Sequence, residues 1–398
     1  MPPGKHAVLS ASGAKRWLSC PPSARLEEKL KDRLGDDGDG GNDYTREGTK
    51  AHELGELKLR KEIGEINDYN FRERVKQLGD IDKEMDEATD QYVAIVMERY
   101  FEAKKSCSDA VLMLETRLDF SRWVPHGFGT GDAIVISDSI LDVMDLKYGK
   151  GVPVDAVDNP QARLYGLGAL EMFGDLYGFT HVRNTIIQPR LDSVTTEMLT
   201  REDLVAWGDT EVRDTAKLAW EGKGEFLPGD HCRFCKVKAV CFARAAEAMK
   251  IFKTGLDNPA MLDDSQIPDI LAYTAIAKSW ITDLENYAQA QAIKGQRWRG
   301  YKLVRGRSNR AWKDSEAVAD NLLRAGYKRE DIIKTELRSV SEVEKLLGKK
   351  AFRTFAEQYT IKPEGKLTLV PESDKRQEVN PADADFSDMG DIDNSDNN

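Results

Sequence analysis

The spacing of apolar residues predicts alternating helices and strands over the first 250 residues. Ala51, Leu54 and Leu57 recur as on one face of a helix, whereas runs such as "AVLMLETRL" are typical of strands. Helices are expected over 44–64, 84–105, 160–174 and about 201–220, and strands over 110–118, 131–137, 140–147 and 179–188. This order of helix, three-strand meander, helix, strand and helix predicts a mixed α/β fold.

The pattern changes after residue 250. A long helix is expected over 265–294, followed by a small α+β domain that extends to about residue 370. The last residues, 371–398, are polar and acidic, which predicts a disordered tail. We therefore expect three parts, with boundaries at 1–250, 251–370 and 371–398.

Composition narrows the class of protein. The chain has 398 residues, of which 40% are apolar and 32% charged, as expected of a globular protein with a sizeable core. No run is apolar enough for a membrane helix, and the N-terminus lacks the apolar segment of a signal peptide, so a cytoplasmic protein is expected. The net charge of −11 argues against indiscriminate binding of nucleic acid.

Charged side chains occur in a stretch that otherwise looks like a buried strand. Asp145 and Lys147 are two residues apart in "LDVMDLK", so they face the same side of the strand. A buried ion pair is one explanation, and a site for a metal ion and water is another. The two-residue turn at 138–139 places Asp132 opposite Asp145. Two converging carboxylates favour a divalent cation with oxygen ligands between them.

Four motifs together resemble the PD-(D/E)XK nuclease superfamily, in its RecB-like and AddB-like branch. They are G-x-x-x-H in "GTKAHEL", an Asp after a Gly in "GTGDAIV", D-x-K in "MDLK" and Q-x-x-x-Y in "PQARLY". D-x-K alone is weak and has a strand-end salt bridge as its simpler explanation, but the ordered set over residues 15–250 is specific. The resemblance implies a restriction-endonuclease-like core with a mixed central sheet flanked by helices. The whole chain is also similar to a phage and prophage family.

The resemblance implies a metal site. Asp132 and Asp145 would bind Mg²⁺ or Mn²⁺ with the carbonyl of Leu146, and His52 would complete the ligands. An imidazole suits Mn²⁺ better than Mg²⁺. Glu115, on the preceding strand, is either a further acid of this site or a solvent-facing side chain.

It also implies three residues that act on the substrate. Lys147 would hold or activate the attacking water and steady the phosphate. Gln161 and Tyr165 are one helical turn apart, so both reach the same site and would orient the lysine and the DNA backbone. The expected reaction is hydrolysis of a phosphodiester bond in DNA.

The cysteines form a second pattern. Cys20, Cys232, Cys235 and Cys241 resemble the one-plus-three arrangement that holds a [4Fe–4S] cluster in iron–sulfur nucleases of this branch. The same spacings also suit zinc, so zinc is kept as the alternative. Cys107 has no place in the pattern and is expected to be a buried thiol.

A basic stretch is the candidate for wider contact with DNA. Residues 294–313 hold eight Lys or Arg and no acid, with tryptophan and tyrosine between them. Such a stretch either binds DNA by backbone neutralisation and base stacking or forms a solvated strand pair. The candidate DNA-binding residues are Arg297, Trp298, Arg299, Lys302, Arg305, Arg307 and Arg310.

These observations lead to one main hypothesis and two alternatives. The main hypothesis is a metal-dependent DNA exonuclease of phage recombination or replication, acting on double-stranded ends or a single strand in the host cytoplasm. The alternatives are a structure-specific endonuclease and a non-catalytic, zinc-stabilised DNA-binding protein. The acidic tail is expected to keep the protein soluble or to contact a phage single-strand-binding or annealing protein.

Overall fold

The structure is a computed structural model in which a mixed β-sheet is flanked by helices. It describes residues 7–34, 43–252, 264–265 and 267–301, with four single positions further along the chain. The chain divides into two compact units, Met1–Gln296 and Arg297–Asn398. The helix expected over 265–294 falls in the first unit. The expected C-terminal α+β domain and acidic tail lie almost entirely outside the described residues, so those expectations stay predictions.

Five strands form the sheet, in the order in which they occur along the chain. They are β1 (Val111–Asp119), β2 (Phe128–Ile136), β3 (Ile140–Leu146), β4 (His181–Gln188) and β5 (Ser193–Thr200). The pairs β1–β2, β2–β3 and β4–β5 are antiparallel, whereas β3 and β4 are parallel. The mixed α/β fold expected from the sequence is therefore confirmed. β3 is the central strand of the sheet.

One strand was not anticipated from the sequence. In β5 the apolar residues Val194 and Met198 are exposed, whereas Glu197 is buried. This reverses the usual pattern of an edge strand, so alternation alone gives no signal. Glu197 is buried because Arg163 on the neighbouring helix pairs with it.

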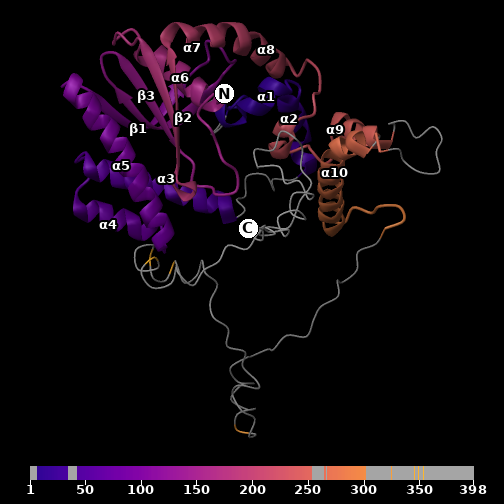
Figure 1. Ribbon diagram of the computed structural model, residues 1–398. Coiled ribbons are helices and arrows are strands. Elements are labelled where there is room, and N and C mark those ends of the chain that lie inside the picture. The colour runs from indigo at the N-terminus through magenta and orange to yellow at the C-terminus, as the bar shows by residue number, and fades with distance from the viewer. Residues whose placement is uncertain are drawn as a thin grey trace, which may run out of the picture. The chain divides into compact units, whose positions relative to one another are not determined.

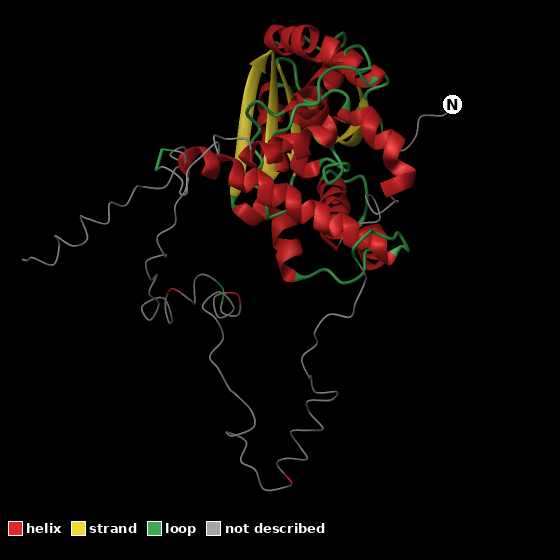
Figure 2. Cartoon of the chain, turned by 90° about the vertical axis from the view of Figure 1, so that its right-hand side faces the viewer, coloured by secondary structure: helices red, strands yellow, loops and turns green. Residues whose placement is uncertain are grey.

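Helices lie on both sides of the sheet (Figures 1 and 2). Those before the sheet are α1 (Ala14–Ser19), α2 (Ser23–Leu34), α3 (Asp43–Glu62), α4 (Asp68–Gln77) and α5 (Lys83–Ser106). The later helices are α6 (Pro160–Phe173), α7 (Arg201–Trp207), α8 (Arg213–Glu221), α9 (Phe242–Ala248) and α10 (Ile267–Ile293). None of the described helices has the length and apolar character needed to span a bilayer.

Two apolar clusters sandwich the sheet. On one face Ile134, Leu141 and Val143 pack with Leu164 and Leu167 of α6. On the other face Val135, Met144 and Leu146 pack with Tyr92 and Val96 of α5 and with Leu59 of α3. Alternate residues of β2 and β3 thus enter opposite clusters, as the pleat of a strand requires. Because both faces of β3 are buried, any charge on it needs a partner.

The sequence also specifies how α6 begins. Asn159 is the N-cap, and its side chain accepts hydrogen bonds from the backbone N–H groups of Gln161 and Ala162. Pro160 follows in the first turn, where its missing N–H has no cost. The start of the helix is therefore set one residue before Gln161, which fixes where that side chain emerges.

The helix expected over 201–220 is present but contains a wide turn. Residues Gly208–Val212 form a single π-type turn between α7 and α8. A side chain at Gly208 would lie 2.8 Å from Nε1 of Trp123, and the same Nε1 donates a hydrogen bond of 2.9 Å to Asp209. The helix therefore widens where it packs around the indole of Trp123.

Candidate active site at the end of the central strand

Six residues singled out from the sequence meet at the C-terminal end of β3. We call them the β3-end cluster: His52, Asp132, Asp145, Lys147, Gln161 and Tyr165. They come from α3, β2, β3, the residue after β3, and α6. The hairpin brings Asp132 and Asp145 together because Ala133 pairs with Met144, which makes Asp132 and Asp145 the next opposed positions. This is the register expected from the two-residue turn.

One half of the cluster is built around Lys147. Its Nζ lies 2.7 Å from Oδ2 of Asp145 and donates a 3.1 Å hydrogen bond to Oε1 of Gln161. The amide nitrogen of Gln161 donates to Oδ1 of Asp145 at 3.2 Å and to the hydroxyl of Tyr165 at 3.3 Å. Gln161 thus orients the carboxylate and the ammonium at once, and Tyr165 is held one helical turn further along α6.

The other half is built around Asp132. Its Oδ2 accepts a 2.7 Å hydrogen bond from the backbone N–H of Leu146 and lies 3.3 Å from Nε2 of His52. The opposite ring nitrogen of His52 lies 2.9 Å from the carbonyl oxygen of Gly48, one turn earlier in α3. The imidazole is therefore held at both nitrogens. Leu146, expected to offer its carbonyl, contributes its N–H to this contact.

Burial and charge shift the titration of this half. Burial alone would lower the pKa of His52, but the charge of Asp132 and hydrogen bonds to Asp132 and Gly48 raise it to about 9. Burial opposes ionisation of Asp132, yet His52 and the N–H of Leu146 hold its pKa below the usual value. The pair is therefore ionised at neutral pH when no cation is bound.

In the half built around Lys147, the pKa of the carboxylate shifts in the opposite direction. Burial raises the pKa of Asp145, and the neighbouring charge of Asp132 adds to this against the attraction of Lys147. The pKa of Lys147 is raised despite burial, because Asp145 lies against it. Burial is thus the main cause that disfavours the charge of Asp145, and a bound cation would favour the ionised carboxylate.

One carboxylate oxygen of the cluster is buried against a single cation. Oδ2 of Asp145 lies 2.7 Å from the ammonium of Lys147 and accepts no hydrogen bond from the other described residues. Buried carboxylate oxygens normally accept hydrogen bonds or bind a metal ion. Together with Asp132 and His52, this oxygen fits a divalent cation with oxygen and imidazole ligands.

Glu115 lies beside the cluster in a strained conformation. It falls between the pairs Leu114–Ala133 and Thr116–Gly131, hence opposite Asp132, and its φ is +47°. This left-handed backbone is uncommon for glutamate and is typical of functional sites. Burial, together with the charges of Asp132 and Glu56, raises the pKa of Glu115 to about 7. The charges of the β3-end cluster therefore act on Glu115. The position of Glu115 along the strand did not by itself show this.

Arg190 is a supporting residue that the sequence gave no reason to select. It lies after β4, and its side chain is only 7% exposed. It pairs with Glu47 of α3 at 3.1 Å and with Glu84 of α5 at 3.0 Å, and it stacks on Tyr148, which follows Lys147. Arg190 thus ties the helix that carries His52 to the strand end that carries Lys147.

The four cysteines of the expected cluster also converge. Cys20, Cys232, Cys235 and Cys241 line one cavity together with apolar residues such as Leu26 and Val237. The backbone N–H of Gly229 donates to the sulfur of Cys232 at 3.5 Å, as amides around metal-bound thiolates do. Burial raises the pKa of Cys235 to about 12, so this thiol is protonated unless a metal displaces the proton.

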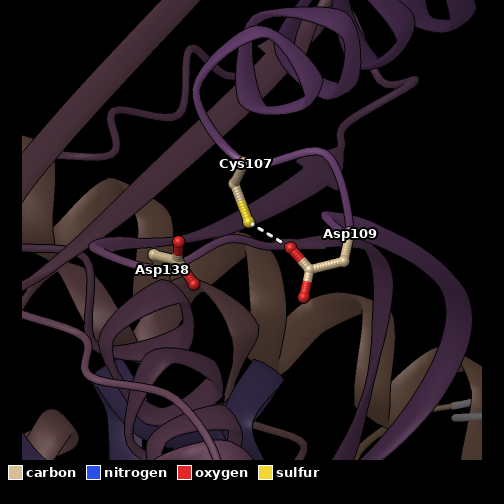
Figure 3. Close-up of side chains that lie close together, drawn as sticks. All are labelled: Cys107, Asp109 and Asp138. Atoms are coloured by element: carbon tan, nitrogen blue, oxygen red, sulfur yellow. Dashed lines mark hydrogen bonds between the residues drawn. The ribbon is translucent and has the colours of Figure 1, made fainter.

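A third group of possible ligands lies at the other end of the β2–β3 hairpin. Cys107, Asp109 and Asp138 have ligand atoms within 4.8 Å of one another (Figure 3). The thiol of Cys107 donates a 3.0 Å hydrogen bond to Asp109, which raises the pKa of the thiol. Both carboxylates are exposed. The expected buried thiol at Cys107 is confirmed, and its partner is an aspartate.

The basic C-terminal stretch is described only at its start. Arg297 and Arg299 are exposed and Trp298 is half-buried. The other candidate DNA-binding residues lie outside the described part of the chain: Lys302, Arg305, Arg307 and Arg310.

Fold and cluster define a mixed α/β protein with an acid–amine–imidazole site at the end of its central strand. The chain belongs to the DUF2800 family, described as a protein of unknown function, whose family model matches residues 6–377. Among solved structures, the chain is similar to one titled "Crystal structure of SSO0001", at 13% identity over 61% of this chain and 90% of that chain. The TM-score of 0.26 is too low for this likeness to carry an argument.

Proposed function

We propose that this protein is a metal-dependent DNA exonuclease that hydrolyses phosphodiester bonds, in keeping with its resemblance to the RecB-like and AddB-like branch of the PD-(D/E)XK nucleases. One observation carries the proposal. The ion pair of Asp145 and Lys147 abuts the pair of Asp132 and His52 at the end of the buried central strand. A purely structural ion pair of Asp145 with Lys147 needs neither a second carboxylate nor an imidazole beside it.

The donor set suits Mg²⁺ or Mn²⁺. Asp132 and Asp145 would hold the ion through carboxylate oxygens, and His52 would offer an imidazole nitrogen once its proton is displaced. Such an ion lowers the pKa of a bound water and neutralises charge that develops on a phosphate. Glu115, opposite Asp132, is the residue from which a further oxygen ligand would come.

The chain's own side chains supply position and charge. Lys147 is protonated because Asp145 raises its pKa, so it acts as a cationic donor that holds a water or a phosphate oxygen. Gln161 fixes the lysine, because its Oε1 accepts a 3.1 Å hydrogen bond from Nζ. Burial raises the pKa of Tyr165, so its hydroxyl stays protonated and can donate a hydrogen bond to the substrate backbone.

The four-cysteine cavity supports a [4Fe–4S] cluster in a structural role. Cys20 precedes α2, and the other three cysteines follow α8, so a cluster would tie the two ends of the first 250 residues. A freshly purified brown protein that contains iron would support this assignment. A colourless protein that contains zinc would support the zinc-stabilised alternative instead.

The function is tested by digestion of end-labelled linear, nicked and covalently closed circular DNA with Mg²⁺ or Mn²⁺. We expect the linear substrate to lose nucleotides from its ends and the closed circle to survive. The Lys147→Ala variant is the inactive control. Cutting of the closed circle would indicate an endonuclease, and failure to cut any substrate with either metal would refute a catalytic role. Action in phage recombination, with a single-strand-binding or annealing partner, is part of the same proposal.

A further inference from the structure

The segment that joins Lys147 to α6 is held in a defined shape by one buried side chain. Gln188, the last residue of β4, is 1% exposed. Its amide nitrogen donates to the carbonyl oxygens of Gly149 at 2.6 Å and Val152 at 2.9 Å, and its amide oxygen accepts from the N–H of Val154 at 3.1 Å. Both N–H donors and the oxygen of the amide thus bind a single loop.

Both ends of this loop are anchored as well. Tyr148 is 3% exposed and packs with Ala51 and Leu54 of α3, on either side of His52 in the sequence. Further along, the N–H of Ala156 donates to the side chain of Thr195, and the N–H of Asp158 donates to Glu197. Ordering a glycine-containing loop opposes folding through lost backbone entropy. Such extensive anchoring therefore indicates that the shape of the loop matters.

The tip of the loop, residues 149–151, is open on its outer side. Gly149, Lys150 and Gly151 are exposed, and a Cβ built on either glycine would meet nothing within 4 Å. Neither glycine has a positive φ. Packing and backbone conformation therefore do not require glycine at either position, and the absence of side chains leaves the backbone open to close approach by a molecule outside the chain.

The polar groups of the tip are complementary to an anion. The carbonyl oxygens of Gly149 and Val152 accept hydrogen bonds from Gln188. The N–H groups of residues 149–151, in contrast, donate no hydrogen bond to the described part of the chain. Consecutive free N–H groups in a turn bind anions. The ammonium of Lys150 is half-exposed and lies 3.3 Å from Glu84, a surface contact that a phosphate can replace.

We propose that the Gly149–Gly151 tip is a docking site for the phosphate backbone of nucleic acid, and that Gln188 is the positioning residue that holds it. The assignment rests on the proposed function for its ligand. Because the tip begins two residues after Lys147, a strand docked on it runs past the β3-end cluster. The tip would bind a phosphate next to the one that is cleaved.

The test measures binding of a short fluorescein-labelled DNA duplex to the full-length protein by fluorescence anisotropy. Ca²⁺ replaces Mg²⁺ or Mn²⁺ in this experiment so that the DNA is not cleaved. Gly149→Ala and Gly151→Ala should each raise the Kd several-fold. Their melting temperatures should stay equal or rise, since alanine restricts the unfolded chain at a position with room for it. Gly178→Ala, at an ordinary φ beside Asp138 at the far end of the hairpin, is the matched control and should leave the Kd unchanged.

The lysine is tested through salt dependence. Lys150→Gln should lower the slope of log K against log salt by about 0.9, the value for one lost phosphate contact on duplex DNA. The matched control is Lys250→Gln, because Lys250 is 52% exposed and also paired, against 53% for Lys150. This control should leave the slope unchanged.

Gln188→Met preserves the size of the side chain but removes its three hydrogen bonds. It should raise the KM for DNA cleavage more than it lowers kcat, because the loop rather than the reacting groups is disturbed. Should this variant fail to fold, the exposed glycine and lysine variants still decide the question.

The outcomes separate the docking site from the proposed function. A wild type that binds the duplex but never cleaves it refutes the exonuclease, while weakened binding by the tip variants still supports the docking site. Wild-type cleavage with unchanged Kd and salt slope in all three tip variants overturns the docking site alone. The docking site is also overturned if Gly178→Ala raises the Kd as much as the tip glycine variants do, or if Lys250→Gln lowers the salt slope as much as Lys150→Gln does. Absence of binding to duplex and single-stranded DNA by the wild type overturns both proposals.

Discussion

Gly129 of β2 lies directly against the ring of Tyr165 of α6. A Cβ at position 129 would come within 2.5 Å of Cε1 of Tyr165, so only glycine lets the tyrosine occupy this place. The strand therefore leaves room for a side chain that the β3-end cluster uses. This contact predicts how a single methyl group would affect the site.

Gly129→Ala should impair the site more than it impairs the fold. The added methyl must displace the ring of Tyr165, an overpacking that costs about 1–3 kcal/mol in the free energy of unfolding. DNA cleavage should fall about as far as in Tyr165→Phe, which removes the hydroxyl without crowding. Melting curves and cleavage rates measured in parallel check this. Wild-type cleavage by Gly129→Ala would show that the position of Tyr165 does not matter.

Lys147→Arg should lose DNA cleavage almost as completely as Lys147→Ala. The planar guanidinium cannot keep the single-atom contacts of Nζ with both Asp145 and Gln161. Loss of a positioned proton donor slows a reaction by about 100-fold or more. Single-turnover cleavage rates with Mn²⁺ measure the effect. An arginine variant with more than a tenth of wild-type activity would contradict the assigned role.

Asp145→Asn should abolish the response of the protein to metal. The neutral amide relieves the burial cost that raises the pKa of Asp145, but it also leaves the buried ammonium of Lys147 without its counter-charge. Because these effects oppose each other, the melting temperature in EDTA should change little. Mn²⁺ should raise the melting temperature of the wild type only. An equal rise with Mn²⁺ in the variant would contradict the assignment of Asp145 as a metal ligand.

The contact between His52 and Asp132 predicts a pH dependence of stability. The folded pKa of His52 is about 9, above its ordinary value of 6.5. The pair therefore stabilises the metal-free protein fully below pH 6.5, and the contribution disappears as the pH rises through 9. The melting temperature in EDTA should exceed that of His52→Gln at pH 6 and converge with it above pH 9. A constant difference across this range would contradict the assignment.

Cys20→Ser and Cys235→Ser should each lose iron and stability. A tie between Cys20 and Cys232 closes a loop whose chain-entropy contribution is about 5 kcal/mol, so a fall of roughly 10 °C or more in melting temperature is expected. Cys107→Ser is the matched control, because Cys107 is also buried and a hydroxyl can keep its hydrogen bond to Asp109. It should retain full iron content. Iron measured per chain decides the outcome.

Local sequence determined those parts of the site that depend on backbone geometry over a few residues. Asp145 and Lys147 share a face because strand residues alternate, and Asp132 meets Asp145 because a two-residue turn sets the register. Gln161 and Tyr165 project together because they are one turn apart on a capped helix. These relations follow from short-range sterics and hydrogen bonding, which the order of residues specifies directly.

Only the tertiary structure decided the relations between residues distant along the chain. Nothing near Gln188 or Arg190 in the sequence shows that one clamps the loop after Lys147 and the other joins α3 to α5. The same holds for β5, whose exposed Val194 and buried Glu197 make sense only beside Arg163. Such contacts depend on how whole elements pack, because the partner that stabilises a buried polar group can come from any part of the chain that packing brings near.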